Sequence, residues 1–302
     1  MITSLLSLYI TSSISPNIDT QIDKVDQNRP NIVKTASFDT SRKDEDFKFP
    51  IKNPYYIEPI IEARAAIGVD MESGAILYEK NVHESMPIAS ITKLMTILII
   101  LEENDLTETV TISQNAAETP GSQMFLRAGE QIALENLVYG AIIHSANDAA
   151  VALSEHNSGS TSAFVEKMNN KAASLGLVNT SFANPTGLDD PNNYSSAYDV
   201  AKLAQEVYSY DFIQHAASFK SLEVKSINGN VTHSLESTND LLDSYLNIKG
   251  LKTGKTDAAG LCLVSVAENI YEDEVVTVVL NSPDRFRETK IFTDWLFRAY
   301  TW

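Results

Sequence analysis

Residues 89–103 read Ala-Ser-Ile-Thr-Lys-Leu-Met-Thr-Ile-Leu-Ile-Ile-Leu-Glu-Glu, and this stretch decides the fold. Its apolar residues occur on nearly every side of a helical projection, which is typical of a helix that is buried all round. Helical patterns continue after it at residues 134–143, 149–156, 162–175 and 197–208. We therefore expect a block of helices that surrounds this central, buried helix.

Strand patterns lie on both sides of the helical block. Residues 65–70 and 75–78 are short apolar runs joined by a Ser-Gly turn, which is typical of a hairpin. After the block, apolar runs occur at residues 222–226, 231–235, 250–255, 261–267 and 275–280, and an amphipathic helical pattern follows at 289–300. This order predicts an α+β fold, in which early and late strands share one antiparallel sheet flanked by helices. A mostly helical subdomain is expected as an insertion at about residues 94–218.

The N-terminal residues have a different composition from the rest of the chain. Residues 1–15 mix Leu, Ile and Tyr with Ser and Thr, and they are a weak candidate for a secretory signal or anchor because no basic residues precede them. A start codon placed too late or a frayed tail would explain them as well. Residues 16–54 are polar and without period, which indicates a flexible spacer. We expect a single domain over residues 55–302, and no stretch is long enough for a spanning helix.

Composition excludes several classes of function. The chain of 302 residues carries 40 Asp and Glu against 23 Lys and Arg, a formal net charge of -17, which disfavours nucleic acid as a partner. Cys262 is the single cysteine, so no intramolecular disulfide can form, and its apolar neighbours indicate a buried strand residue. The five histidines lack the spacing of a zinc peptidase, and we expect neither a metal nor a cofactor.

Ser90 and Lys93 are three residues apart at the start of the buried helix, so their side chains share one face. A serine hydroxyl needs a base within hydrogen-bond reach to act as a nucleophile. A lysine can be that base only where burial or a second cation lowers its pKa well below about 10.4. The apolar residues 94–98 supply the burial. In isolation the pattern is weak, because a helix start with a surface lysine produces the same spacing by chance.

Two further short motifs follow in the chain. Ser145 and Asn147 lie between two helical segments, where a hydroxyl could relay a proton and an amide could hold a substrate carbonyl or orient the lysine. A capped interhelical loop would look the same. Residues 252–254 are Lys-Thr-Gly on a late strand, where ammonium and hydroxyl groups suit a carboxylate. Gly254 would leave room for a peptide alongside that strand, although a strand ending in a glycine turn is the simpler interpretation.

The combination of the three motifs decides between these interpretations. Ser-x-x-Lys, Ser-x-Asn and Lys-Thr-Gly occur in this order, each in the expected context of helix start, interhelical loop and late strand. A closely similar triplet characterises the serine enzymes that react with penicillin. The sequence therefore predicts a serine-acylating site.

Over roughly residues 62–301 the chain resembles the low-molecular-mass penicillin-binding proteins of the D-alanyl-D-alanine carboxypeptidase type. The likeness extends beyond the triplet to its surroundings, at residues 87–96, 145–150, 182–188, 238–242 and 250–256. Class A β-lactamases match less well, because they usually carry Ser-Asp-Asn in the middle element. The resemblance implies the penicillin-binding protein or β-lactamase-like transpeptidase fold and action outside the cytoplasmic membrane.

The resemblance also implies an activity and a role for each residue. Such enzymes remove the terminal D-alanine from peptidoglycan pentapeptides through an acyl-enzyme, and β-lactam antibiotics inhibit them. Ser90 would be the nucleophile, Lys93 its base and Ser145 the proton relay. The remaining roles would be substrate binding by Asn147, Lys252, Thr253, Gly254 and Arg285, and an oxyanion hole from the backbone N–H groups of Ser90 and Lys255. Arg287 lies close to Arg285 and is the alternative for that position.

Several departures and alternatives remain at this stage. Relatives often carry a C-terminal β-rich domain and an amphipathic anchor helix, neither of which we expect here, so membrane attachment would depend on the N-terminal segment. Position 255 often holds His or Tyr in relatives and is Lys in this chain. The same site would also fit a D-alanyl endopeptidase that cuts cross-links. A β-lactamase, for which no deacylation base is evident, and a non-catalytic cell-wall binder are weaker alternatives.

Overall fold

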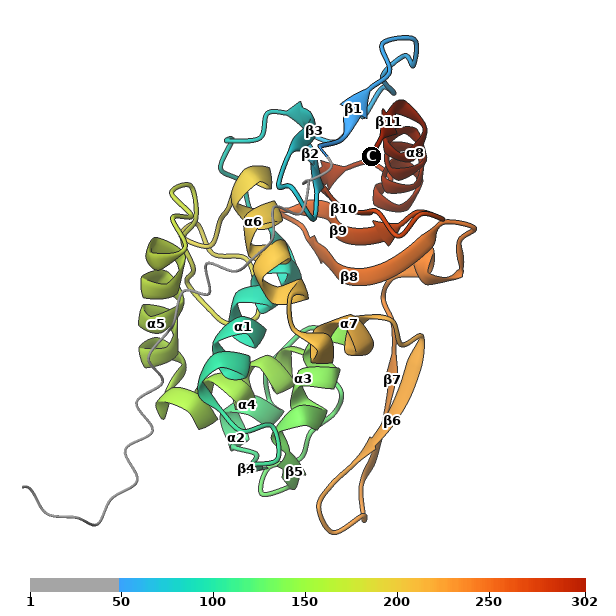
Figure 1. The fold of residues 1–302 in the computed structure, drawn as a ribbon. Coiled ribbons are helices and arrows are strands. Elements are labelled where there is room, and N and C mark those ends of the chain that lie inside the picture. The colour runs from blue at the N-terminus through green and yellow to red at the C-terminus, as the bar shows by residue number, and fades with distance from the viewer. Residues whose placement is uncertain (1–48) are drawn as a thin grey trace, which may run out of the picture. The chain divides into compact units, whose positions relative to one another are not determined.

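The computed structural model of the chain describes residues 49–302, so the expectations for residues 1–15 and for most of the spacer lie outside the described residues. A five-stranded antiparallel sheet has the order β3-β2-β10-β9-β8 (Figure 1). Its strands are β2 (Ala65–Asp70), β3 (Ile76–Lys80), β8 (Asn247–Thr256), β9 (Gly260–Glu268) and β10 (Glu274–Ser282). The predicted sharing of one sheet by early and late strands is confirmed for these five, whereas the predicted runs at 222–226 and 231–235 form a separate two-stranded sheet. β8 is an edge strand, so one side of its backbone is free of strand neighbours.

The helical block follows the hairpin β2–β3, as predicted. It begins with the 3₁₀ turn η1 (Ala89–Thr92), which leads into α1 (Lys93–Glu103), whose residues 93–100 are all buried. The other helices are α2 (Gln114–Ala117), α3 (Leu134–Ile143), α4 (Asn147–Ser158), α5 (Thr161–Ser174), α6 (Ala197–Tyr208) and α7 (Asp211–Ala217). α1 contacts α3, α4, α5 and α6, so it is the centre of the block.

Helices cover both faces of the sheet. Alternate strand residues point to opposite faces, and Ile67, Val276 and Val278 belong to the apolar cluster that contains α1 and α6. Ala66, Val275 and Val279 belong to a second cluster with Phe292 and Leu296 of α8 (Arg285–Ala299). Burial on both faces explains why these strands are continuous apolar runs in the sequence.

Short elements differ from the sequence prediction. β1 (Ile51–Lys52) pairs with β11 (Tyr300–Thr301), so ordered structure begins before residue 55. The pair β4 (Thr109–Thr111) and β5 (Gln131–Ala133) was not predicted, because three-residue strands show too few alternations to stand out. α8 starts four residues earlier than expected, where the Asp284 carboxylate caps the backbone N–H of Arg287.

The hairpin of β6 (Ser221–Lys225) and β7 (Thr232–Glu236) turns at Asn228-Gly229, as predicted, and lies alongside the helical block (Figure 1). Through the residues after β7 it leads back to β8 of the main sheet. Within residues 49–302, no helix combines the length and the apolar character needed to cross a lipid bilayer.

Candidate active site

A cleft of about 220 Å³ lies where η1, the start of α4 and the edge strand β8 meet. The structure brings all three sequence motifs to this cleft. The predicted residues that line it are Ser90, Ser145, Asn147, Thr253, Gly254, Lys255 and Arg285. Lys93 and Lys252 lie beneath its surface and are fully buried. Arg287 does not line the cleft, and its side chain is exposed.

The amine of Lys93 is surrounded by oxygen atoms. Its Nζ lies 2.9 Å from Ser90 Oγ, 2.6 Å from Asn147 Oδ1 and 2.7 Å from the backbone oxygen of Thr186. Burial holds the pKa of Lys93 well below its ordinary value of 10.5, and the nearby charge of Lys252 lowers it further. The buried carboxylate of Asp148 opposes this shift of the Lys93 pKa. The geometry is that of a serine hydroxyl in contact with a desolvated amine.

Lys252 is the second buried amine of the site. Its Nζ donates to the carbonyl of Thr253 at 3.0 Å. Burial lowers the pKa of Lys252 to about 7, and the charge of Arg285 contributes in the same direction. Lys252 and Gly254 are two residues apart in β8 and so share one side of the strand. Lys252 and Arg285 supply the basic groups on this side of the site, within a chain that is acidic as a whole.

The side chain of Asn147 has a defined orientation. Its Oδ1 faces the Lys93 amine, and its Nδ2 donates to the carbonyl of Pro120 at 2.7 Å. Gly121 has a φ of +94°, and a Cβ atom at this position would come within 2.5 Å of Asn147 Nδ2. The turn at residues 120–121 therefore holds the amide closely and needs glycine to do so.

The far side of the cleft is formed by Thr253, Thr238 and Arg285. The hydroxyls of Thr238 and Thr253 are 2.5 Å apart, and Arg285 donates to the carbonyl of Gly254 at 2.7 Å. Arg285 Nε has no partner within the described part of the chain. Of the two arginines considered from the sequence, Arg285 is thus the one that reaches β8. Hydroxyl, guanidinium and ammonium groups converge here as needed to bind a carboxylate.

Two residues with an unusual backbone conformation lie at the same place. Ser145 and Ala89 have positive φ values of +61° and +48°, which residues with a side chain seldom adopt. Ala89 directly precedes Ser90, and its carbonyl packs against Gly187, where a Cβ atom would come within 2.0 Å of that oxygen. The loop at residues 184–188 thus presses on the start of η1 and fixes the backbone that carries Ser90.

One reason given for a predicted residue needs correction. Gly254 was expected to leave room for a bound peptide, but a Cβ atom there would meet the backbone oxygen of Ile88 at 2.8 Å. The strand pairs Gly254 with Cys262, which faces the helical block. The absent side chain therefore lets β8 approach η1, which brings Lys252 and Ser90 into one site.

Four positions were not assigned a role from the sequence. Thr186 supplies a backbone carbonyl to Lys93, Gly187 packs on Ala89, Thr238 contacts Thr253, and Pro120 holds Asn147. The residue types at 184–188 and at Pro120-Gly121 favour turns. Nothing in a residue type reveals that its backbone oxygen will face a buried amine.

A larger groove of about 650 Å³ lies behind the loop at residues 183–188. It shares Thr186 and Leu188 with the smaller cleft, but neither Ser90 nor either buried lysine lines it. If size alone decided where the active site lies, the larger groove would be chosen. The smaller cleft is favoured by Ser90, by the two buried lysines with lowered pKa values and by the unusual backbone around Ser90. We take the smaller cleft as the candidate active site, because chemistry requires those groups to converge.

The chain was compared with known proteins. The family model described as D-alanyl-D-alanine carboxypeptidase (Peptidase_S11) matches residues 53–284. D-alanyl-D-alanine carboxypeptidase DacF of Bacillus subtilis is 38% identical over 246 residues, which are 79% of this chain and 63% of that protein. A D-alanyl-D-alanine endopeptidase of Pseudomonas aeruginosa is 33% identical over 236 residues, covering 77% of this chain and 76% of that protein.

The crystal structure of the Streptomyces K15 DD-transpeptidase is similar with a TM-score of 0.76 and 30% identity, covering 80% of this chain and 99% of that one. This likeness confirms the predicted fold class. The chain spans less than two thirds of the length of DacF, whereas it matches nearly all of the K15 chain. On the match of the family model to most of its length, the chain belongs to the D-alanyl-D-alanine carboxypeptidase family of serine peptidases.

Proposed function

We propose that the chain removes the terminal D-alanine from peptidoglycan pentapeptides by acylation of Ser90. The observation that carries this proposal is the set of three oxygens around Lys93 Nζ. Two of them, Asn147 Oδ1 and the Thr186 carbonyl, can only accept hydrogen bonds. A neutral amine satisfies both with its two hydrogens and turns its lone pair to the Ser90 hydroxyl, which is the arrangement of a general base.

In the first step, Lys93 takes the proton of Ser90 while Oγ attacks the carbonyl carbon between the two terminal D-alanines. Burial favours the neutral amine that this step needs, and the neighbouring charge of Lys252 acts in the same direction. The carbonyl oxygen becomes an oxyanion, and the backbone N–H groups of Ser90 and Lys255 stabilise it. The negative charge of Asp148 stabilises the Lys93 ammonium that forms.

The second half of the reaction returns the protons. The proton on Lys93 passes through the Ser145 hydroxyl to the nitrogen of the scissile bond, the C–N bond breaks, and free D-alanine leaves. An ester joins the shortened peptide to Ser90. Neutral Lys93 then takes a proton from water, whose oxygen attacks the ester, and Ser90 Oγ leaves with that proton. Asn147 positions the substrate during both steps.

The terminal carboxylate of the substrate is bound by the cationic side of the cleft. Thr253 and Arg285 line the cleft with a hydroxyl and a guanidinium, and the amine of Lys252 is buried beneath its surface. This set explains why a strongly acidic chain would take an anionic peptide end. β-Lactam antibiotics carry a carboxylate and a strained amide, so we expect them to acylate Ser90 as well. The substrate places the action outside the cytoplasmic membrane.

A D-alanyl endopeptidase is the second candidate, supported by the similarity to the Pseudomonas aeruginosa endopeptidase. It would use the same groups to cut a cross-link between two stem peptides. The two reactions differ in the leaving group that the cleft must accept, which is a single D-alanine for the carboxypeptidase and a second stem peptide for the endopeptidase. Parallel assays on a pentapeptide and on a cross-linked dimer separate them, because each releases a different product.

The test of the proposed function is D-alanine release by the variant Ser90→Ala. We expect release from a pentapeptide ending in D-Ala-D-Ala to fall to background, with an unchanged melting temperature. Ser85→Ala is a matched control, because Ser85 is exposed and its hydroxyl donates to the carbonyl of Asn179, which does not line the cleft. Release that persists in Ser90→Ala would contradict the mechanism.

A further inference from the structure

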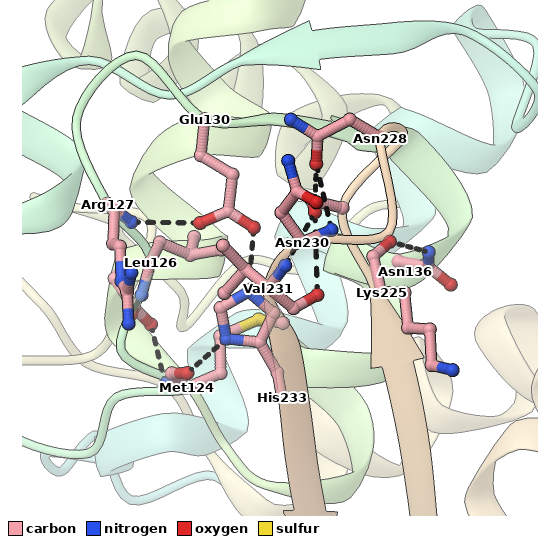
Figure 2. Close-up of polar contacts among 12 residues, drawn as sticks. Met124, Leu126, Arg127, Glu130, Asn136, Lys225, Asn228, Asn230, Val231 and His233 are labelled. Carbon is pink, nitrogen blue, oxygen red and sulfur yellow. Dashed lines mark hydrogen bonds and ion pairs between the residues drawn. The ribbon is translucent and has the colours of Figure 1, made fainter.

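A buried ion pair lies outside the active site, between the β6–β7 hairpin and the loop that precedes β5 (Figure 2). His233 belongs to β7, and Glu130 lies directly before β5. The side chains of both residues are only 3% exposed, and His233 Nε2 is 2.7 Å from Glu130 Oε1. The mechanism above uses neither residue, although burial of two ionisable groups is costly without a partner.

The neighbours of His233 determine where its hydrogens must be. Its Nδ1 lies 2.7 Å from the carbonyl oxygen of Met124, and its Nε2 faces the Glu130 carboxylate (Figure 2). A carbonyl can only accept, so Nδ1 donates to Met124, and one hydrogen lies between Nε2 and the Glu130 carboxyl group. The other Glu130 oxygen accepts from the backbone N–H of Arg127 at 3.1 Å. Both side chains of the pair therefore have fixed partners.

Met124 connects this pair to the start of α4. Its carbonyl accepts from His233, while its N–H donates to Asp148 Oδ1 at 3.1 Å. The N–H of Leu126 donates to the other oxygen of Asp148, also at 3.1 Å. Asp148 is completely buried and directly follows Asn147. The backbone of residues 124–126 therefore contacts the ion pair on one side and the first turn of α4 on the other.

The same segment contacts Asn147 itself. The backbone N–H of Asn147 donates to the carbonyl of Ser122 at 2.7 Å, and its side-chain Nδ2 donates to that of Pro120 at 2.7 Å. Residues 120–126, which we call the backing segment, thus hold Asn147 by main chain and side chain. The amide they hold is the one whose oxygen faces Lys93.

β7 also leads to the opposite side of the cleft. Two residues after its end, Thr238 donates its backbone N–H to the carbonyl of Ile143 at 3.2 Å and bonds the Thr253 hydroxyl. His233 therefore links the backing segment to the strand that continues into the carboxylate side of the cleft. Both sides of the cleft depend on where the hairpin is docked.

We propose that His233 and Glu130 are positioning residues for the reaction at Ser90. They lock the hairpin onto the backing segment, and through it they keep the Asn147 amide against Lys93. This inference rests on the proposed function, and neither residue touches the substrate. Loss of the pair would free the backing segment to shift, and small displacements of catalytic groups reduce rates strongly.

The test compares His233→Gln and Glu130→Gln with a matched control pair elsewhere. His156 Nε2 lies 2.7 Å from Glu108 Oε2, and their side chains are 23% and 40% exposed. His156 belongs to the last part of α4, at the end away from Asn147. His156→Gln therefore removes the same kind of contact at the far end of the helix that begins at Asn147, without touching the backing segment.

We expect the rate of Ser90 acylation by a penicillin to fall about tenfold or more in His233→Gln and Glu130→Gln. The kcat for D-alanine release should fall in parallel, with KM changed less than about threefold, because Lys252, Thr253 and Arg285 remain. Glu130→Asp keeps the charge and should recover part of the rate. Rates within twofold of the original protein in both Gln variants, or an equal loss in His156→Gln, would overturn the proposal. Circular dichroism ensures that all rates are taken on folded protein.

If the variants fail to fold, the contact of His233 can still be tested by a measurement on the unaltered protein. In protein labelled with ¹⁵N at histidine, Nδ1 of His233 should show a directly bonded hydrogen, because it donates to the carbonyl of Met124. A His233 Nδ1 without hydrogen would overturn the proposal. The two hypotheses fail separately: an unaltered protein that releases no D-alanine contradicts the proposed function, whereas an active protein with unaffected Gln variants contradicts only the positioning role.

Discussion

The two faces of the central sheet are filled in different ways. On the α8 face, aliphatic and aromatic side chains such as Phe292, Trp295 and Leu296 pack on Ala66 and Val279. On the other face, the seam between η1, α4 and β8 contains two fully buried lysines. Burial of apolar groups stabilises a fold, whereas burial of amines costs stability and is retained where it supports chemistry. The comparison predicts that substitutions on the α8 face reduce stability and those in the seam reduce activity.

The largest effect is expected for Lys93→Met. Removal of the general base should lower the rate of Ser90 acylation by about 10³-fold. The melting temperature should change little, because the cost of burying an amine is removed while the buried oxygens of Asn147 and Thr186 lose their donor. Stopped-flow acylation with a fluorescent penicillin and a thermal melt measure both. A clear loss of stability would contradict the contrast between the two faces.

Leu296→Ala tests the opposite face. Leu296 is fully buried against β2, where Gly68 leaves room for its methyl groups. We expect the free energy of unfolding to fall by about 2–5 kcal/mol because the truncation leaves a cavity. The acylation rate of the folded protein should stay within about twofold. Urea denaturation measures the first quantity, and a tenfold slower acylation would show that the faces are coupled.

Arg285→Ala and Arg287→Ala form a matched pair. Arg285 reaches the carbonyl of Gly254, whereas Arg287 is exposed and away from the cleft. We expect Arg285→Ala to raise KM for the pentapeptide by about tenfold or more, since a hydrogen bond to a charged group is worth about 1.5–3 kcal/mol. Arg287→Ala should leave kcat and KM unchanged. Equal effects of the two substitutions would contradict the assignment of Arg285 to the site that binds the substrate carboxylate.

The smallest expected effect is a change in how the free energy of unfolding depends on pH. Burial and the charge of Arg285 lower the pKa of Lys252 to about 7, so from there to about 10.5 the unfolded chain binds more protons than the folded one. The free energy of unfolding contributed by this group therefore rises with pH over that window and no longer changes below it. Lys252→Met should flatten the rise between pH 7 and 9 in urea denaturation. Parallel curves for the two proteins would contradict the lowered pKa.

Much of the fold and part of the site followed from the sequence. The buried helix, the hairpin and the late strands were visible as patterns, because burial on both faces of the sheet leaves long apolar runs. The three motifs identified Ser90, Lys93, Asn147 and Lys252, which the structure brings to one cleft.

Other features left no trace in the pattern of residues. Thr186 contacts Lys93 through its backbone carbonyl, and every residue type has the same backbone carbonyl. His233 and Glu130 are 103 positions apart, and only the folded chain shows that they pair. Gly254 was placed correctly in the site but for a different reason, because its contact with Ile88 depends on how η1 packs on β8.

The role of Ser90 as the nucleophile is tested most directly by a mass spectrum of the protein after incubation with a penicillin. Acylation adds the whole antibiotic, because ring opening releases no leaving group. We expect one adduct per chain, located by peptide mapping on the fragment that contains Ser90, and no adduct on Ser90→Ala. An adduct on another residue such as Ser145, or no adduct on folded protein, would contradict the central claim.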